Sequence, residues 1–131
     1  MNQSVEAASL PIAALTGDPV VRVGPTTPLQ VIAGTLVEAE VGAVVVGGGE
    51  RPEGIVSERD IVHAIAAGVD PSTTAGELAH TSLIWCDAEA TVGEVAGQMM
   101  DRYVRHILVE EDGRLLGIVS ARDLLGVYAS D

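Results

Sequence analysis

The most informative stretch of the chain reads Gly54-Ile55-Val56-Ser57-Glu58-Arg59-Asp60-Ile61. It returns as Gly117-Ile118-Val119-Ser120-Ala121-Arg122-Asp123-Leu124, with six of the eight positions identical. The two copies start 63 residues apart (117 minus 54), close to half of the 131-residue chain. The same shift superposes similar residues along most of the sequence. We therefore expect a duplicated unit, with one repeat over residues 10–66 and the other over residues 73–129.

The spacing of apolar residues predicts the elements of the first repeat. Thr26-Thr27-Pro28 is typical of a helix start, with a hydroxyl cap and a proline in the first turn. We expect a helical turn at 11–15, a strand at 20–23, a helix that starts near residue 28, strands at 43–46 and 54–57, and a second helix at 59–66. The two helices are expected to bury Leu29, Ile32, Ala33, Leu36 and Val37, and Ile61, Val62 and Ile65.

The second repeat is expected to follow the same order. Its predicted elements are a short helix at 75–79, strands at 83–86, 106–109 and 116–119, a turn at 110–113, and a helix that buries Val92, Val95, Ala96, Met99 and Met100. Residues 1–9 are expected to be a frayed tail. Each repeat thus has the order β-α-β-β-α, which predicts an α+β fold. About 55 residues cannot bury both faces of so small a sheet, so we expect the two repeats to pack against each other with pseudo-twofold symmetry.

Composition excludes several classes of partner. The net charge is −12, and the chain has no Phe, one Trp and two Tyr. Binding to nucleic acid or to an anionic membrane needs a basic surface, so neither partner is expected. Cys86 is the only cysteine, which rules out a disulfide within the chain. No signal-peptide pattern and no apolar run of about 18 residues is present, so a soluble cytoplasmic protein is expected.

The sequence resembles the CBS domain family. Three features carry the resemblance: the duplicated β-α-β-β-α pattern, the repeated Gly-hydrophobic-Val-Ser-x-x-Asp run, and Val104-Arg105-His106-Ile107-Leu108-Val109. The chain looks like a stand-alone tandem pair, called a Bateman module, and the resemblance covers about residues 10–129. It implies that the two small sheets are packed face to face and leave two clefts between the repeats, which bind AMP, ADP, ATP, S-adenosylmethionine or NAD. It also implies a homodimer.

The resemblance assigns roles to individual residues. Asp60 and Asp123 match the family's ribose-binding position, and Ser57 and Ser120 match a hydroxyl near the ribose and phosphate. Arg105 and His106 match the family's basic pair, which often meets the phosphates. Arg59 and Arg122 lie within the motif, and we expect their positive charges to add to phosphate binding. The residues expected near the adenine are Val21, Val23, Ile84, Gly42, Val104 and Ile118.

The two predicted sites are not equivalent. The first repeat has Gly42 and Ala43 where the second has the basic pair Arg105 and His106. In a chain of net charge −12, local positive groups are needed to hold a polyanion. We therefore expect the site at Ser120 and Asp123 to bind phosphate better.

A purely structural interpretation of the motif stays open. Ser-x-x-Asp before an apolar helical face is also close to a capping box, in which the two side chains satisfy backbone N–H groups. Capping and ligand binding can coexist because both use the same helix end. The three histidines, His63, His80 and His106, lack metal-ligand spacing, so no metal site is expected. We expect Cys86 to be a buried thiol.

These observations support three hypotheses of function. The first is a non-enzymatic sensor that binds an adenine nucleotide and signals to an unidentified protein partner by conformational change. The second is a structural or dimerisation module without a ligand, which Gly42 and Ala43 favour. The third, an enzyme, lacks support because the chain offers no constellation of catalytic residues.

Overall fold

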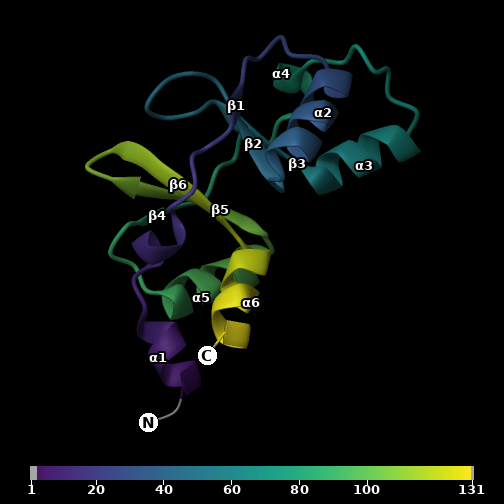
Figure 1. Cartoon of the computed structure of the whole chain (residues 1–131). Coiled ribbons are helices and arrows are strands. Elements are labelled where there is room, and N and C mark those ends of the chain that lie inside the picture. Colours follow the sequence, from purple (N-terminus) through teal and green to yellow (C-terminus); the bar gives the residue numbers. More distant parts are fainter. Residues whose placement is uncertain (1–2, 131) are drawn as a thin grey trace. The chain divides into compact units, whose positions relative to one another are not determined.

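The computed structural model describes residues 3–130, which divide into two compact units. Residues 20–83 form the central unit. The segments on either side of it, up to Pro19 and from Ile84 onward, together form the terminal unit. Figure 1 shows the helices and strands of both units. No helix among residues 3–130 is long and apolar enough to cross a membrane.

The central unit has a three-stranded sheet in the order β1-β2-β3. The strands are β1 (Arg22–Val23), β2 (Ala43–Val46) and β3 (Gly54–Ser57). The helices of this unit are α2 (Leu29–Ala39), α3 (Glu58–Ala66) and α4 (Ala75–Leu78). β1 and β2 are parallel and are connected through α2, whereas β2 and β3 form an antiparallel hairpin.

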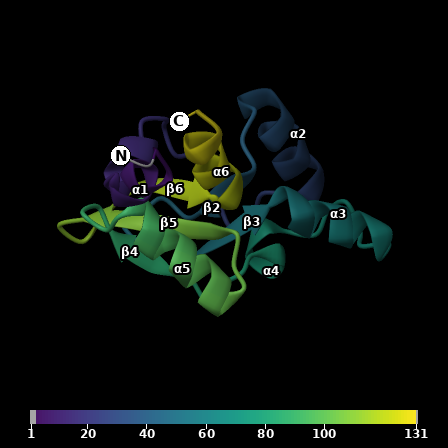
Figure 2. The ribbon, with the colours of Figure 1, turned by 90° about the horizontal axis from the view of Figure 1, so that it is seen from below.

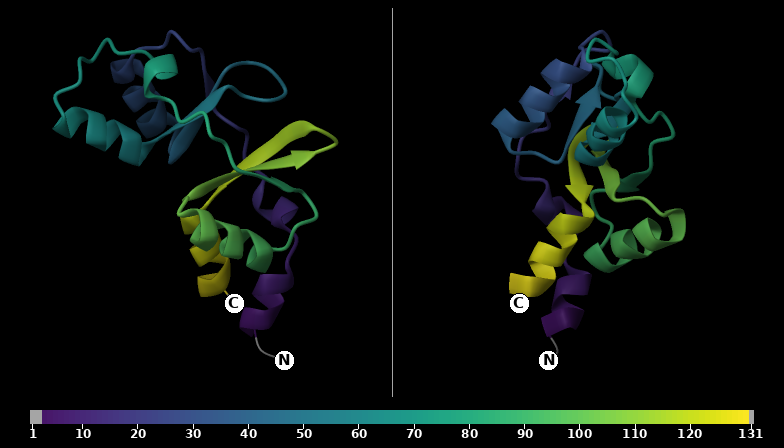
Figure 3. Two further views of the ribbon diagram at one scale, coloured as in Figure 1. Left: turned by 180° about the vertical axis from the view of Figure 1, so that it is seen from behind. Right: turned by 90° about the vertical axis from the view of Figure 1, so that its right-hand side faces the viewer.

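The terminal unit repeats this plan within residues 3–19 and 84–130. Its sheet has the order β4-β5-β6, with β4 (Trp85–Asp87) parallel to β5 (His106–Glu111) and β5 antiparallel to β6 (Arg114–Ser120). Figure 3 shows the long β5–β6 hairpin. The helices are α1 (Gln3–Ser9), the 3-10 turn η1 (Ile12–Leu15), α5 (Val92–Arg102) and α6 (Ala121–Ser130). The α+β class and the repeated element order are confirmed.

Each unit has its own apolar core. In the central unit, Ile32 of α2 packs with Val44 and Val56 of the sheet and with Ala75 of α4. In the terminal unit, Val95 of α5 packs with Ile107 and Val119 of the sheet and with Ile12 of η1. The short segment that leads each sequence repeat therefore packs with the sheet of the other repeat. For this reason the compact units and the sequence repeats have different bounds.

The buried faces of the helices are narrower than predicted. Leu29, Ile32 and Leu36 of α2 are buried, but Val37 is 77% exposed. Val37 lies eight residues after Leu29, about 80° around the helix from it, and so lies beside the stripe that faces the sheet. Met100 of α5 is 76% exposed for the same reason. In α3 the buried residues are Ile61 and Ala64, so the prediction that Val62 and Ile65 are buried was wrong.

Other expectations were also wrong. Pro28 is the N-cap residue of α2, so this helix has no proline in its first turn and Thr27 is not its cap. The turn predicted over residues 110–113 is shorter, because β5 runs through Glu111 and β6 starts at Arg114. Asp112 and Gly113 have φ of 53° and 80°, values typical of the two-residue turn that matches strand twist.

Residues 3–9 form the helix α1 instead of the expected frayed tail. α1 lies against α5 and α6, and Ala7 is buried. Figure 2 shows α1 beside α6. Packing of these small residues on two neighbouring helices explains why a segment without a strong helical pattern is ordered.

The glycines that open the repeated motif lie where another segment crosses the sheet. A β-carbon added at Gly54 would lie 2.8 Å from the Ala79 β-carbon and 2.9 Å from the His80 carbonyl oxygen. One added at Gly117 would lie 2.7 Å from the β-carbon of Thr16. These distances are shorter than real contacts. The motif glycine therefore allows the leading segment to pack directly on the strand.

We expect Gly54→Ala to lower the free energy of unfolding by roughly 1–3 kcal/mol, because the new methyl group meets backbone that cannot move freely. The matched control is Gly34→Ala in α2, where an added β-carbon has no described atom within 4 Å. This control should raise stability by roughly 0.5–1 kcal/mol through helix propensity. Denaturant titration measures both changes, and a stable Gly54→Ala variant would contradict the close approach.

Candidate functional site

The junction between β3 and α3 forms a capping box. The Ser57 backbone N–H donates to Asp60 Oδ2 at 2.8 Å, and the Asp60 N–H donates to Ser57 Oγ at 3.3 Å. The Ser57 hydroxyl also lies 3.0 Å from Asp60 Oδ2. The capping role predicted from the sequence is confirmed. We call Ser57, Arg59 and Asp60 the first corner.

The junction between β6 and α6 has the same two hydrogen bonds between backbone and side chain. The Ser120 N–H donates to Asp123 Oδ2 at 2.8 Å, and the Asp123 N–H donates to Ser120 Oγ at 3.1 Å. We call Ser120, Arg122 and Asp123 the second corner. Each aspartate uses Oδ2 for the helix cap, so Oδ1 can serve a further partner without disturbing the cap.

Backbone hydrogen bonds bring the segment before the middle strand to each corner. The Glu58 N–H donates to the Gly42 carbonyl at 2.9 Å, and the Ala121 N–H donates to the Arg105 carbonyl at 2.8 Å. Ala43 pairs with Ser57 across the sheet, and His106 pairs with Ser120. The basic pair therefore lies beside the second corner, as the sequence predicted, and two small residues lie beside the first.

One backbone N–H remains available at the start of each helix. Among the described residues, the N–H groups of Arg59 and Arg122 have no hydrogen-bond acceptor. Both side chains are exposed. The first turn of a helix attracts anions because its N–H groups are unpaired and the helix dipole is positive there. Each corner thus offers a carboxylate for hydroxyl groups next to an N–H for a phosphate oxygen.

The structure adds a residue to the first corner that the sequence analysis did not include. His80 Nε2 lies 2.7 Å from Asp60 Oδ1. His80 belongs to the segment after α4, 20 residues beyond Asp60. A comparison of the repeats could have singled it out, because the 63-residue shift places His80 on Gly17 and so marks a difference between the two copies.

The residues predicted to contact adenine lie at the sheets. Val21 and Val23 pack against the core of the central unit, and Ile84 and Val104 against the core of the terminal unit. Ile118 is half-buried on β6, and Gly42 is half-buried beside the first corner. Their role with a ligand stays a prediction.

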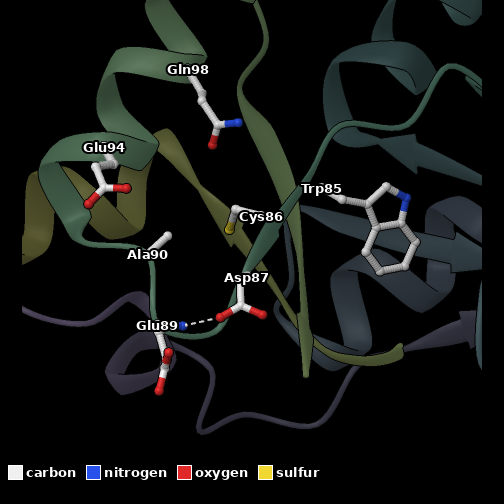
Figure 4. A pocket seen from close by; sticks show the side chains of 7 residues that line it. All are labelled: Trp85, Cys86, Asp87, Glu89, Ala90, Glu94 and Gln98. Atoms are coloured by element: carbon white, nitrogen blue, oxygen red, sulfur yellow. Dashed lines mark hydrogen bonds between the residues drawn. The ribbon is translucent and has the colours of Figure 1, made fainter. Parts of the chain in front are cut away.

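A separate hollow of about 610 Å³ lies in the terminal unit (Figure 4). Its lining residues are Trp85, Cys86, Asp87, Glu89, Ala90, Glu94 and Gln98, and none of them was predicted as a site residue. Figure 4 shows Cys86 directed from β4 toward α5 and Trp85 directed to the opposite side. The three carboxylates would repel a phosphate, so this hollow does not suit a nucleotide.

Cys86 is a buried thiol, as the sequence predicted. Burial, together with the negative charges of Asp87 and Glu110, raises the pKa of this thiol to about 11. A protonated thiol is a poor nucleophile. Among residues 3–130, no three side chains of His, Cys, Asp or Glu lie together in a group that could hold a metal ion.

Comparison with known proteins identifies the family. The model of the CBS domain matches the chain twice, over residues 12–67 and 69–130. The chain belongs to the CBS domain family. It is a tandem CBS pair, and the two corners are the strand-to-helix junctions of its two CBS repeats.

Three matches place the chain within the family. Hypoxic response protein 1 of Mycobacterium tuberculosis is 39% identical over 105 residues, which cover 78% of this chain and 73% of that protein. A crystal structure of Hypoxic Response Protein I with two coordinated zinc ions has a TM-score of 0.71 and 34% identity, over 88% of this chain and 97% of that one. A CBS domain protein from Pyrobaculum aerophilum complexed with AMP has a TM-score of 0.80 and 28% identity, over 93% and 100%.

The state of Cys86 leads to a testable prediction. At about pH 8 the native thiol is ionised in about one molecule in a thousand, whereas an unfolded cysteine is ionised in a sizeable fraction. We expect alkylation by iodoacetamide to be at least about 100-fold slower in the native chain than in the unfolded chain. Mass spectrometry of quenched samples measures both rates. Equal rates would show that the thiol is not buried and that its pKa is not raised.

Proposed function

We propose that this tandem CBS pair is a non-enzymatic regulatory module that binds an adenine nucleotide at the second corner. One observation carries the proposal. The second corner combines a carboxylate oxygen outside the helix cap, an unpaired helix N–H and a neighbouring basic pair in one place. The similar protein solved with AMP makes AMP the first ligand to test.

Each group of the second corner matches a part of a nucleotide. Asp123 Oδ1 can accept hydrogen bonds from the two adjacent hydroxyls of a ribose, which a charged acceptor strengthens. The N–H of Arg122 can donate to a phosphate oxygen, and the exposed Arg105 side chain adds positive charge beside it. These positive groups matter because the chain as a whole carries a charge of −12.

Regulation would follow from differential binding. A nucleotide that contacts Ser120, Asp123 and Arg105 at once connects the start of α6 to the start of β5. It would favour the conformation in which these groups are in reach of the ligand, and a protein partner that binds this conformation would sense the nucleotide. S-adenosylmethionine and NAD also carry an adenosine ribose, and they remain alternative ligands of the same corner.

A homodimer is part of the proposal. In the central unit, the packed helices α2 and α3 expose Val31, Val37, Val62 and Ile65. In the terminal unit, the packed helices α5 and α6 expose Met100, Leu125 and Tyr128, and Tyr103 caps the end of α5. Tyr103 is 95% exposed. Large apolar side chains gathered on neighbouring helices favour burial against a second protein surface. A ligand-free dimerisation module, the alternative function, would use the same helices.

We expect AMP to bind the wild-type chain, and Asp123→Asn to weaken binding by about tenfold or more through loss of a charged acceptor. Asp60→Asn is the matched control, because both aspartates make the same cap with the same 2.8 Å hydrogen bond to serine. Its effect should be smaller. Isothermal titration calorimetry with AMP, ADP, ATP, S-adenosylmethionine and NAD measures these affinities, and the absence of binding to all five would exclude the nucleotide function.

The dimer has its own test. Native mass spectrometry should show a species of twice the 13.5 kDa chain mass. We expect Val37→Glu and Met100→Glu to shift the protein to monomer, because each places a charge in an apolar surface. Gln30→Glu also adds one charge to an exposed position of α2 and should leave the dimer intact. A monomeric wild-type chain would contradict this part of the proposal.

A further inference from the structure

The segment after α4 holds His80 at the first corner. The His80 N–H donates to the Ile55 carbonyl and the Ile55 N–H donates to the His80 carbonyl, each at 3.0 Å. Gly54, next to Ile55, leaves room for this backbone to lie directly on β3. The two hydrogen bonds fix the position of the His80 backbone, and its side chain reaches Asp60 from there. The contact is therefore part of the local fold.

This contact occupies the oxygen that a ribose would need. Asp60 Oδ2 already accepts from the backbone and the hydroxyl of Ser57, at 2.8 and 3.0 Å. Asp60 Oδ1 lies 2.7 Å from His80 Nε2, the distance of a good hydrogen bond. The Asp60 side chain is 18% exposed, whereas that of His80 is 67% exposed. Both carboxylate oxygens thus have partners, Ser57 at Oδ2 and His80 at Oδ1.

The second corner is open at the equivalent place. The residue that the repeat aligns with His80 is Gly17, which has no side chain. Within the described residues, a β-carbon added at Gly17 has nothing within 4 Å, and Asp123 Oδ1 accepts no hydrogen bond. The two corners therefore share the cap and differ in access to the aspartate.

We propose that His80 is a built-in competitor that closes the first corner to the 2′,3′-diol of a ribonucleotide. The inference rests on the proposed function. An oxygen of a carboxylate accepts about two hydrogen bonds, so both ribose hydroxyls can bind Asp60 Oδ1 only if they displace the imidazole, whereas at Asp123 they displace only water. Because the His80 side chain is largely exposed, the competition is modest, and we expect it to weaken binding at the first corner by about tenfold. The chain then has one strong nucleotide site and one latent site.

Removal of the imidazole tests the inference on the full chain. Calorimetry with AMP should show one strong site in the wild type, and Asp123→Asn should abolish it. His80→Ala should add a second site, tightened by about tenfold, which Asp60→Asn in the same chain removes again. His80→Gln keeps an N–H donor that can reach Asp60 Oδ1, so this variant should retain the wild-type single site.

The reciprocal change tests the same idea at the other corner. Gly17→His places an imidazole at the position that the repeat aligns with His80, and we expect it to weaken AMP binding at the second corner by about tenfold. Gly17→Ala is the matched control, because it changes the backbone freedom but adds no donor. It should bind AMP as the wild type does.

The outcomes separate this inference from the proposed function. Two equal AMP sites in the wild type, with no change in His80→Ala, would overturn the competitor role while the nucleotide function stands. Loss of AMP binding at the first corner in His80→Ala would show that His80 contacts the ligand, and this result would also overturn the competitor role. No binding of AMP to the wild type or to any variant would overturn both.

Discussion

A chain segment lies so close to the opening glycine of each motif that a side chain at that position has no room. Gly54 faces Ala79 and His80, and Gly117 faces Thr16. Much of the local structure depends on this close approach. It allows the segment that leads the second repeat to complete the core of the central unit, where Ala75 is buried. In the same way, the segment that leads the first repeat completes the core of the terminal unit, where Ile12 is buried. In the central unit it also brings His80 within reach of Asp60. A packing constraint thus determines what surrounds a candidate binding group.

Capping and binding use the same aspartates through different oxygens. Oδ2 of Asp60 and of Asp123 accepts the serine N–H and so stabilises the start of α3 and α6. The cap holds the carboxylate at a fixed place, which reduces the entropy that a ligand would lose on binding to Oδ1. The structural and the functional interpretations of the motif are therefore compatible. Because the cap needs only one oxygen, a neighbour such as His80 can regulate the other without loss of the helix.

Most secondary structure followed from local patterns. The strands Ala43–Val46 and Gly54–Ser57 are confirmed with their predicted bounds, because a continuous apolar run between glycines has few alternatives. The capping box and the buried Cys86 are confirmed as well. The errors occurred where packing overrides pattern. Val37 and Met100 continue an apolar spacing yet are exposed, and α1 is a helix because α5 and α6 support it. The corner residues were predicted as ligand contacts, and that prediction awaits the binding experiments.

The sequence by itself determined the duplication, the element order, the family and the difference between Arg105-His106 and Gly42-Ala43, because all of these are differences or repeats along the chain. Only the tertiary structure decided which repeat each leading segment packs on and which oxygen of each aspartate stays accessible. His80 and Asp60 are 20 residues apart, and no periodicity links a connector to a helix start. Their contact depends on the path of the backbone past Gly54, which is a matter of three-dimensional space and not of spacing in sequence.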